Sequence, residues 1–197
     1  MNTTPVDYSP IPPSPQRSGS GCFSFVIDVL ETLVLSLILF VAINAVSARI
    51  RVDGSSMEPT LHSGEFVIVN KLAYKLGAPA LGDIIVFHFP RDPKQEYIKR
   101  VIGMPGDQVT IQDGKVFVNG QEIVEPYISA PPVYPGNTWQ VPEGNLFVLG
   151  DNRNNSSDSH NWGTVPTEYV VGKALFVYWP LDSWGLIEHI STASAAP

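Results

Sequence analysis

Hydrophobic residues form one unbroken run near the N-terminus and then alternate with polar residues through much of the remaining chain. The run reads TLVLSLILFVAI over 32–43, and its uncharged flank continues to Ala48. From Val29 to Ala48 a helix would span about 30 Å, the thickness of a bilayer's hydrocarbon core. Arg49 and Arg51 close this stretch. The pattern predicts a membrane-spanning helix.

Three interpretations of this stretch compete. Its apolar residues occupy every helical face, which favours a transmembrane anchor over 22–50. Small residues at Ala45, Ser47 and Ala48 also resemble the cleavage region of a signal peptide, although the preceding residues hold two acids and only one base. A buried core helix is the third interpretation. The flanking arginines alone favour a cytoplasmic C-terminal side.

The rest of the chain shows the pattern of β-strands. Segments rich in β-branched and aromatic residues are bounded by Gly, Pro, Asn and Asp, and no long helical periodicity follows Arg51. Asp113-Gly114 between two such segments predicts a tight hairpin. We expect a mainly antiparallel β domain, barrel-like or coiled, over 51–190. The expected strands are 65–72, 83–89, 96–103, 108–112, 115–120, 145–150 and 173–179.

Several segments lie outside this pattern. Residues 1–21 are rich in Pro, Ser and Gly, which predicts a disordered tail, and 191–197 form a short C-terminal tail. Residues 125–144 are Pro-rich and predict a long irregular excursion between strands.

Charge and cysteine content narrow the functional classes. The formal net charge is −7, which argues against nucleic acid as a partner because phosphate binding needs a basic surface. Cys22 is the single cysteine, so no intrachain disulfide can form.

Two segments contain candidate catalytic groups. Small residues and a proline around Ser56 predict an irregular backbone that can present a hydroxyl beside N–H groups. An ordinary Ser-rich turn without a catalytic role would have the same composition. In the strand at 96–103, Tyr97, Lys99 and Val101 share one face. Burial against apolar neighbours can free a lysine amine as a base, whereas arginine stays protonated. The alternative is a lysine at a strand edge with its amine in water.

A third segment, 150–159, is dense in hydrogen-bonding groups and follows an apolar strand. It could orient a catalytic amine, or it could bind calcium, although no Glu closes the loop. The chain lacks a G-x-S-x-G motif, which disfavours a Ser–His–Asp triad. The histidines available for such a triad are His62, His88, His160 and His189.

Together these segments resemble the conserved boxes of type I signal peptidases, also called leader peptidases. They occur in the family's order, just after the apolar stretch, and the resemblance covers about residues 25–185. The four boxes read S-M-x-P-T-L at 56–61, G-D-I-I-V-F at 82–87, Y-I-K-R-V-I-G-x-P-G-D at 97–107 and G-D-N-x-x-x-S-x-D-S at 150–159.

The resemblance implies a coiled antiparallel sheet with a small cap inserted at about 108–142. It also implies a membrane-bound serine endopeptidase in which the Ser56 hydroxyl attacks a peptide carbonyl and neutral Lys99 is the general base. Four residues would have supporting roles. Ser156 would hold the amine in place, Asp151 and Arg100 would pair to brace the site, and Asp158 would support the loop. No metal or organic cofactor is implied.

The implied substrates are secreted preproteins, which lose their signal peptides by cleavage. The enzyme would cross the plasma membrane once, with its catalytic domain outside the cytoplasm. A thylakoid membrane is the alternative location for the enzyme. Met57, Leu61 and Tyr97 are expected to line shallow substrate pockets. Membrane lipid is expected against an apolar face that carries Met57, Trp139, Trp179 and Trp184.

Two positions depart from the family's pattern. Many members have a serine two residues before the nucleophile as a second oxyanion donor, and here that residue is Gly54. Some have an arginine two residues after the loop aspartate, and here that residue is His160. Two other functions stay open: another Ser–Lys protease of this fold, such as a self-cleaving repressor or a pilin processor, and a silent membrane-tethered binding domain.

Overall fold

The structure, a computed structural model, describes residues 21–189. The predicted N-terminal tail, apart from Gly21, and the predicted C-terminal tail lie outside this range. The chain divides into two compact units, Met1–Ala42 and Ile43–Pro197.

Helix α1, Gly21–Val46, is apolar on all sides. Its 24-residue stretch Phe23–Val46 has a mean hydropathy of 2.5 and is not buried within the protein, unlike a core helix. Its length and composition suit a membrane span, and a signal sequence would share them. The helix ends before the predicted limit because Ser47–Arg51 form strand β1, whose backbone pairs with β2.

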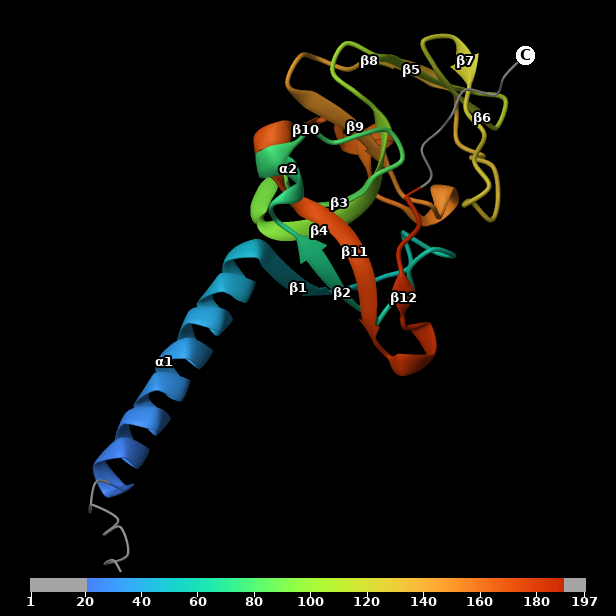
Figure 1. The fold of residues 1–197 in the computed structure, drawn as a ribbon. Helices are drawn as coiled ribbons and strands as arrows, with labels where there is room; N and C mark the ends of the chain where they lie inside the picture. Colours follow the sequence, from blue (N-terminus) through green and yellow to red (C-terminus); the bar gives the residue numbers. More distant parts are fainter. Residues whose placement is uncertain (1–20, 190–197) are drawn as a thin grey trace, which may run out of the picture. The chain divides into compact units, whose positions relative to one another are not determined.

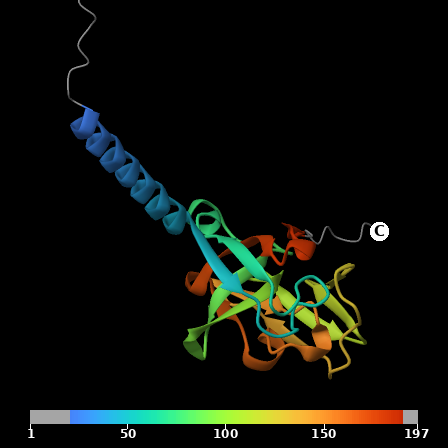
Figure 2. The ribbon, with the colours of Figure 1, turned by 90° about the horizontal axis from the view of Figure 1, so that it is seen from below.

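The larger sheet contains eight strands, and all its pairings are antiparallel (Figures 1 and 2). Its strand order is β1-β2-β11-β3-β4-β9-β10, with β12 paired to β11. Within the described residues β1 and β10 do not pair, so the sheet is open and not a closed barrel. The bounds are β2 Phe66–Asn70, β3 Ile84–Phe89, β4 Asp92–Gly103, β9 Asn145–Leu149, β10 Val165–Pro166, β11 Val170–Trp179 and β12 Gly185–Leu186.

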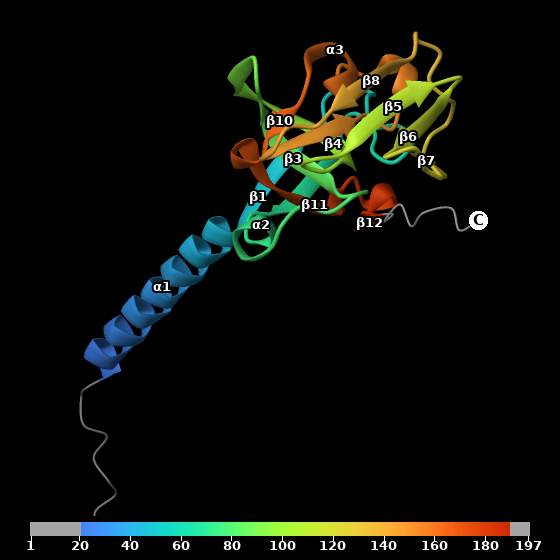
Figure 3. The same ribbon diagram turned by 90° about the horizontal axis from the view of Figure 1, so that it is seen from above.

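A smaller four-stranded sheet is inserted between β4 and β9, in the segment where the cap is expected (Figure 3). Two of its turns, Asp113-Gly114 and Asn119-Gly120, have positive φ at both residues, which is the geometry of a two-residue type I′ hairpin. The strands are β5 Gln108–Gln112, β6 Lys115–Val118, β7 Gln121–Glu122 and β8 Asn137–Gln140.

Helical segments after β1 are short, as the sequence predicts. They are α2 Ala73–Leu76, α3 Ser159–Trp162 and the 3₁₀ turns Arg153–Asn155, Thr167–Tyr169 and Leu181–Ser183. The predicted mainly antiparallel β fold is therefore confirmed.

Strand β4 contributes to all three hydrophobic clusters of the body. Ile98 packs in the first cluster, Ile102 in the second and Val101 in the third. The second cluster also takes side chains from the small sheet, including Val109 and Ile111. Because β4 is held from several sides, the polar residues between these apolar ones are placed rigidly.

Candidate active site

Ser56 lies in a turn that is held in place by buried neighbouring side chains and by backbone hydrogen bonds. The neighbouring Met57 and Leu61 side chains are fully buried in the first cluster, and the Leu61 N–H donates to the Met57 carbonyl at 2.9 Å. The Ser56 carbonyl accepts a hydrogen bond from the Asn152 N–H at 3.0 Å. The turn is therefore fixed both to the core and to the loop that follows β9.

Lys99, in the middle of β4, reaches this serine. Its Nζ lies 2.7 Å from Ser56 Oγ and 2.9 Å from the Ile98 carbonyl oxygen, to which it donates. The residue is only 4% exposed. Burial lowers the pKa of Lys99 to about 8, against the opposing effect of the Asp158 and Asp151 carboxylates. A buried amine of lowered pKa within hydrogen-bond distance of a hydroxyl can act as a general base.

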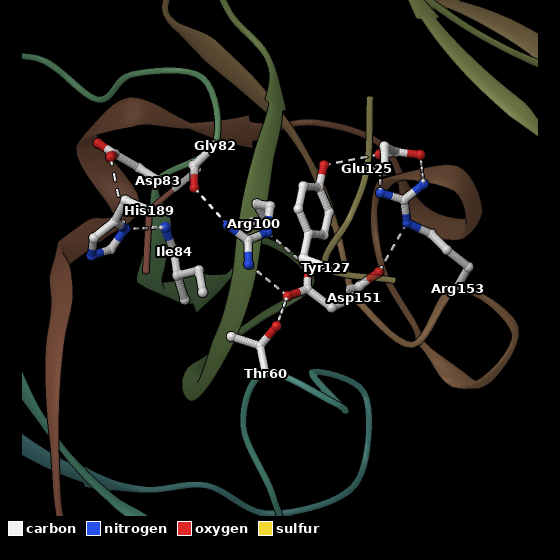
Figure 4. Close-up of polar contacts among 11 residues, drawn as sticks. Thr60, Gly82, Asp83, Ile84, Arg100, Glu125, Tyr127, Asp151, Arg153 and His189 are labelled. Atoms are coloured by element: carbon white, nitrogen blue, oxygen red, sulfur yellow. Dashed lines mark hydrogen bonds and ion pairs between the residues drawn. The ribbon is translucent and has the colours of Figure 1, made fainter. Parts of the chain in front are cut away.

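Arg100 points to the opposite face of β4 and is fully buried. Its guanidinium donates two hydrogen bonds to Asp151, Nε to Oδ1 at 2.8 Å and Nη2 to Oδ2 at 2.7 Å, and a third to the Gly82 carbonyl at 2.9 Å (Figure 4). The Tyr127 ring covers the guanidinium, with its centroid 4.0 Å from Arg100 Cζ. The Thr60 hydroxyl donates to Asp151 Oδ2 at 2.5 Å. This network joins β4, the serine turn, the 150–160 loop and the inserted segment.

The same loop is tied to the inserted segment at a second point. Arg153 is buried, forms an ion pair with Glu125 and donates from Nε to the Gly150 carbonyl at 3.1 Å (Figure 4). Asn154 donates to the Pro131 carbonyl at 3.0 Å. The sequence did not identify Glu125, Tyr127 or Arg153 as members of the site, because nothing local marks residues that pair across long separations.

Gly150 allows the loop to pack tightly against the serine turn. A Cβ at this position would lie 2.4 Å from the Ser56 carbonyl oxygen and 2.3 Å from Ser156 Oγ, so only glycine fits without a shift. Ser156 Oγ is buried, and within the described residues it has no hydrogen-bond partner. The structure therefore places Ser156 beside the serine turn without joining it to Lys99.

Asp158 holds the start of α3 and the end of β9. Its Oδ2 accepts from the Gly150 N–H at 2.9 Å, and its Oδ1 lies 2.6 Å from His160 Nδ1. The Tyr134 ring from the inserted segment stacks on His160 with centroids 4.0 Å apart. His160, two residues after Asp158, therefore contacts both this carboxylate and the inserted segment.

A cleft of about 650 Å³ opens at Ser56 and Lys99. Of the three expected substrate-contacting residues, Tyr97 lines it, whereas Met57 and Leu61 lie in the core. The apolar lining comes instead from Ile50, Val86 and Ile98. The alternation of apolar and charged residues in 48–51 is a local signal for a strand at Ile50, although the sequence predicts the end of the membrane helix for this segment.

His189, His62 and Gly54 have partners outside the Ser56–Lys99 pair. His189 Nδ1 accepts from the Ile84 N–H at 3.1 Å (Figure 4), and His62 faces Glu65. The Gly54 N–H donates to Ser63 Oγ at 3.2 Å. Among residues 21–189, no three His, Cys, Asp or Glu side chains converge where they could hold a metal ion.

Comparison with known proteins assigns the family. The model of the family described as "Signal peptidase, peptidase S26" matches residues 26–179, well over half of the chain. This chain belongs to the signal peptidase I family. Signal peptidase I of Leptolyngbya laminosa is 40% identical over 92% of this chain and 93% of its own length. Probable signal peptidase I-2 of a Synechocystis strain is 42% identical over 82% of this chain and 77% of its own.

A further signal peptidase relative comes from a plant organelle. Thylakoidal processing peptidase 1 of Arabidopsis thaliana is 41% identical over 66% of this chain, although the match covers only 41% of its own length. Together with the apolar helix α1, such relatives fit membrane association of this chain.

The Arg100–Asp151 pair generates a prediction about stability. Asp151→Asn should lower the free energy of unfolding by roughly 3–5 kcal/mol, because it leaves Arg100 buried without its anion. In the matched control Glu122→Gln, the exposed partner Lys115 stays hydrated, so the loss should be below about 1 kcal/mol. Urea unfolding of the full chain in detergent, followed by tryptophan fluorescence, measures both. Equal losses would show that the buried pair does not brace the fold.

Proposed function

We propose that this protein removes N-terminal signal peptides from preproteins at a membrane surface, with Ser56 as nucleophile and Lys99 as general base. The observation that carries the proposal is the 2.7 Å approach of Lys99 Nζ to Ser56 Oγ at a lysine that is almost fully buried. An ordinary lysine has a pKa near ~10.4, so only about one amine in a few thousand is neutral at pH 7. Burial is the physical means of raising that fraction.

The proposed reaction has two stages. Neutral Lys99 accepts the Ser56 proton while Oγ bonds to the carbonyl carbon of the last signal-peptide residue, and the departing amine of the mature protein takes that proton as the peptide bond breaks. Water then loses a proton to Lys99 and attacks the ester. Protonated Lys99 then returns the proton to Ser56 Oγ as the ester bond breaks, and the signal peptide leaves with a new carboxyl end.

The supporting residues act through position in this proposal. Arg100 and Asp151 hold β4, the serine turn and the 150–160 loop in register. The Asp158 and Asp151 carboxylates raise the pKa of Lys99 and so limit how far burial lowers it. Ser156 is proposed to steady the amine when substrate closes the cleft, because its buried hydroxyl has a hydrogen bond to offer.

The membrane part of the proposal rests on α1 and on exposed aromatic residues. Helix α1 would anchor the chain in the plasma membrane, or in a thylakoid membrane, with the body outside the cytoplasm. Of the expected interfacial tryptophans, Trp179 and Trp184 are 52% and 63% exposed. Trp139 instead packs on Phe147, with ring centroids 5.2 Å apart.

The lowered pKa predicts the pH dependence of cleavage. The neutral amine is the active form, so kcat/KM should rise about tenfold per pH unit below pH 8 and level off above it. Cleavage of a preprotein-derived peptide between pH 6 and pH 10 measures the profile. A rising limb centred near 6.5, the ordinary pKa of histidine, would point to a histidine base.

Substitution of the two catalytic candidates tests the chemistry. Ser56→Ala and Lys99→Arg should each lower kcat by about 10³-fold or more, because arginine keeps the charge but accepts no proton. Lys94→Arg, at an exposed position of the same strand, is the matched control and should cleave normally. Near-normal cleavage by folded Lys99→Arg would contradict the Ser–Lys mechanism, and full function of Ser56→Ala would indicate a binding domain.

Topology forms a separate prediction. Protease added outside intact cells should digest the 52–197 body, because the proposed reaction takes place where exported preproteins emerge. Immunodetection of epitopes at the two ends of the chain measures it, with a cytoplasmic protein as the integrity control. Protection of the body until lysis would contradict the proposed orientation, which the flanking Arg49 and Arg51 by themselves disfavour.

A further inference from the structure

An apolar groove of about 560 Å³ lies on the body, apart from the catalytic cleft. Its apolar lining comes from β2, α2, β11 and the residue at which the apolar helix passes into β1. These residues include Val46, Ile68, Leu72, Ala73, Leu76 and Leu175. Leu76 is 86% exposed, so an apolar side chain borders the groove with nothing among residues 21–189 covering most of it.

Chain connectivity places this groove at the membrane surface if α1 spans the bilayer. Val46 is the last residue of the helix and Ser47 the first of β1, and both line the groove. A helix that spans the hydrocarbon core ends near the lipid headgroups. One end of the groove is therefore at the depth where acyl chains meet their headgroups.

Charge around the groove differs from the rest of the chain. Residues 66–82, which supply the lining from β2 and α2, contain Lys71 and Lys75 and no Asp or Glu, in a chain of net charge −7. Lys71 and Lys75 flank Leu72. Lys71 Nζ lies 3.4 Å from the Asn44 carbonyl oxygen, at the helix end, while Lys75 is exposed. Lysines beside apolar side chains can extend their amines to lipid phosphates.

We propose that this groove binds one anionic phospholipid, with an acyl chain along Ile68, Leu72 and Leu175 and the phosphate beside Lys75 and Lys71. The inference rests on the proposed membrane anchoring and deepens it. The bound lipid would hold the β2, α2 and β11 edge of the body to the bilayer. A lipid with no net charge lacks the attraction to the lysines and would bind less tightly.

The test counts lipids on the full chain carrying Ser56→Ala, so that lipid binding is read without peptidase activity. The protein in neutral detergent receives equal phosphatidylglycerol and phosphatidylcholine, and native mass spectrometry measures the retained lipid. One phosphatidylglycerol per chain should be retained. Ala73→Phe, which fills the groove, should reduce retention about tenfold or more, whereas Val133→Phe, at an exposed site of the inserted segment, should not.

Charge variants test the headgroup contact. Lys75→Gln should remove most of the preference for phosphatidylglycerol over phosphatidylcholine, and Lys94→Gln, an exposed lysine elsewhere in the body, should leave it unchanged. If Ala73→Phe does not fold, Leu76→Gln at its exposed position should show the same loss of retained lipid.

Three results would overturn the inference. Equal lipid retention by Ala73→Phe and Val133→Phe would place the lipid elsewhere on the chain. Equal retention of the two lipids by the unsubstituted groove would remove the role of the lysines. A lipid-free dimer broken by Ala73→Phe would assign the groove to a second copy. Failure of the proposed peptidase function would appear separately, in the cleavage assay with Ser56 intact.

Discussion

Burial of the Lys99 amine against Ser56 is the constraint on which the rest of the site depends. In the proposed mechanism the amine has to lose its proton near neutral pH, which burial favours, while it stays in contact with the hydroxyl. Every nearby anion opposes this requirement. The two carboxylates that raise the pKa of Lys99 have other hydrogen-bond partners: Asp151 accepts from Arg100 and Thr60, and Asp158 contacts the Gly150 N–H and His160.

Alternation along β4 places the neighbouring side chains of Lys99 and Arg100 in different environments. Lys99 and Arg100 point to opposite faces because successive strand side chains do. Arginine stays charged when buried, so its face must supply an anion, and Asp151 does so with two hydrogen bonds. Lysine on the other face meets a hydroxyl and a carbonyl oxygen. One strand can therefore both brace the site and hold a proposed neutral base.

The inserted segment is part of this brace as well as a separate small sheet. Its Tyr127 covers Arg100, its Glu125 pairs with Arg153, and its Tyr134 stacks on His160. Each contact falls on the 150–160 loop or on the arginine that holds it. Buried ion pairs contribute little net stability, but removal of one partner is costly, so such contacts restrict the loop to one arrangement.

The sequence by itself determined the strand-rich body, the tight turns and the apolar helix, because periodicity, turn chemistry and length are local properties. It also singled out Ser56 and Lys99, through boxes whose order resembles a family. Only the tertiary structure decided that 47–51 form a strand, because that depends on pairing with β2. It likewise placed Met57 and Leu61 in the core and brought Glu125 to Arg153. No local pattern encodes which distant side chains meet, since that follows from how whole elements pack.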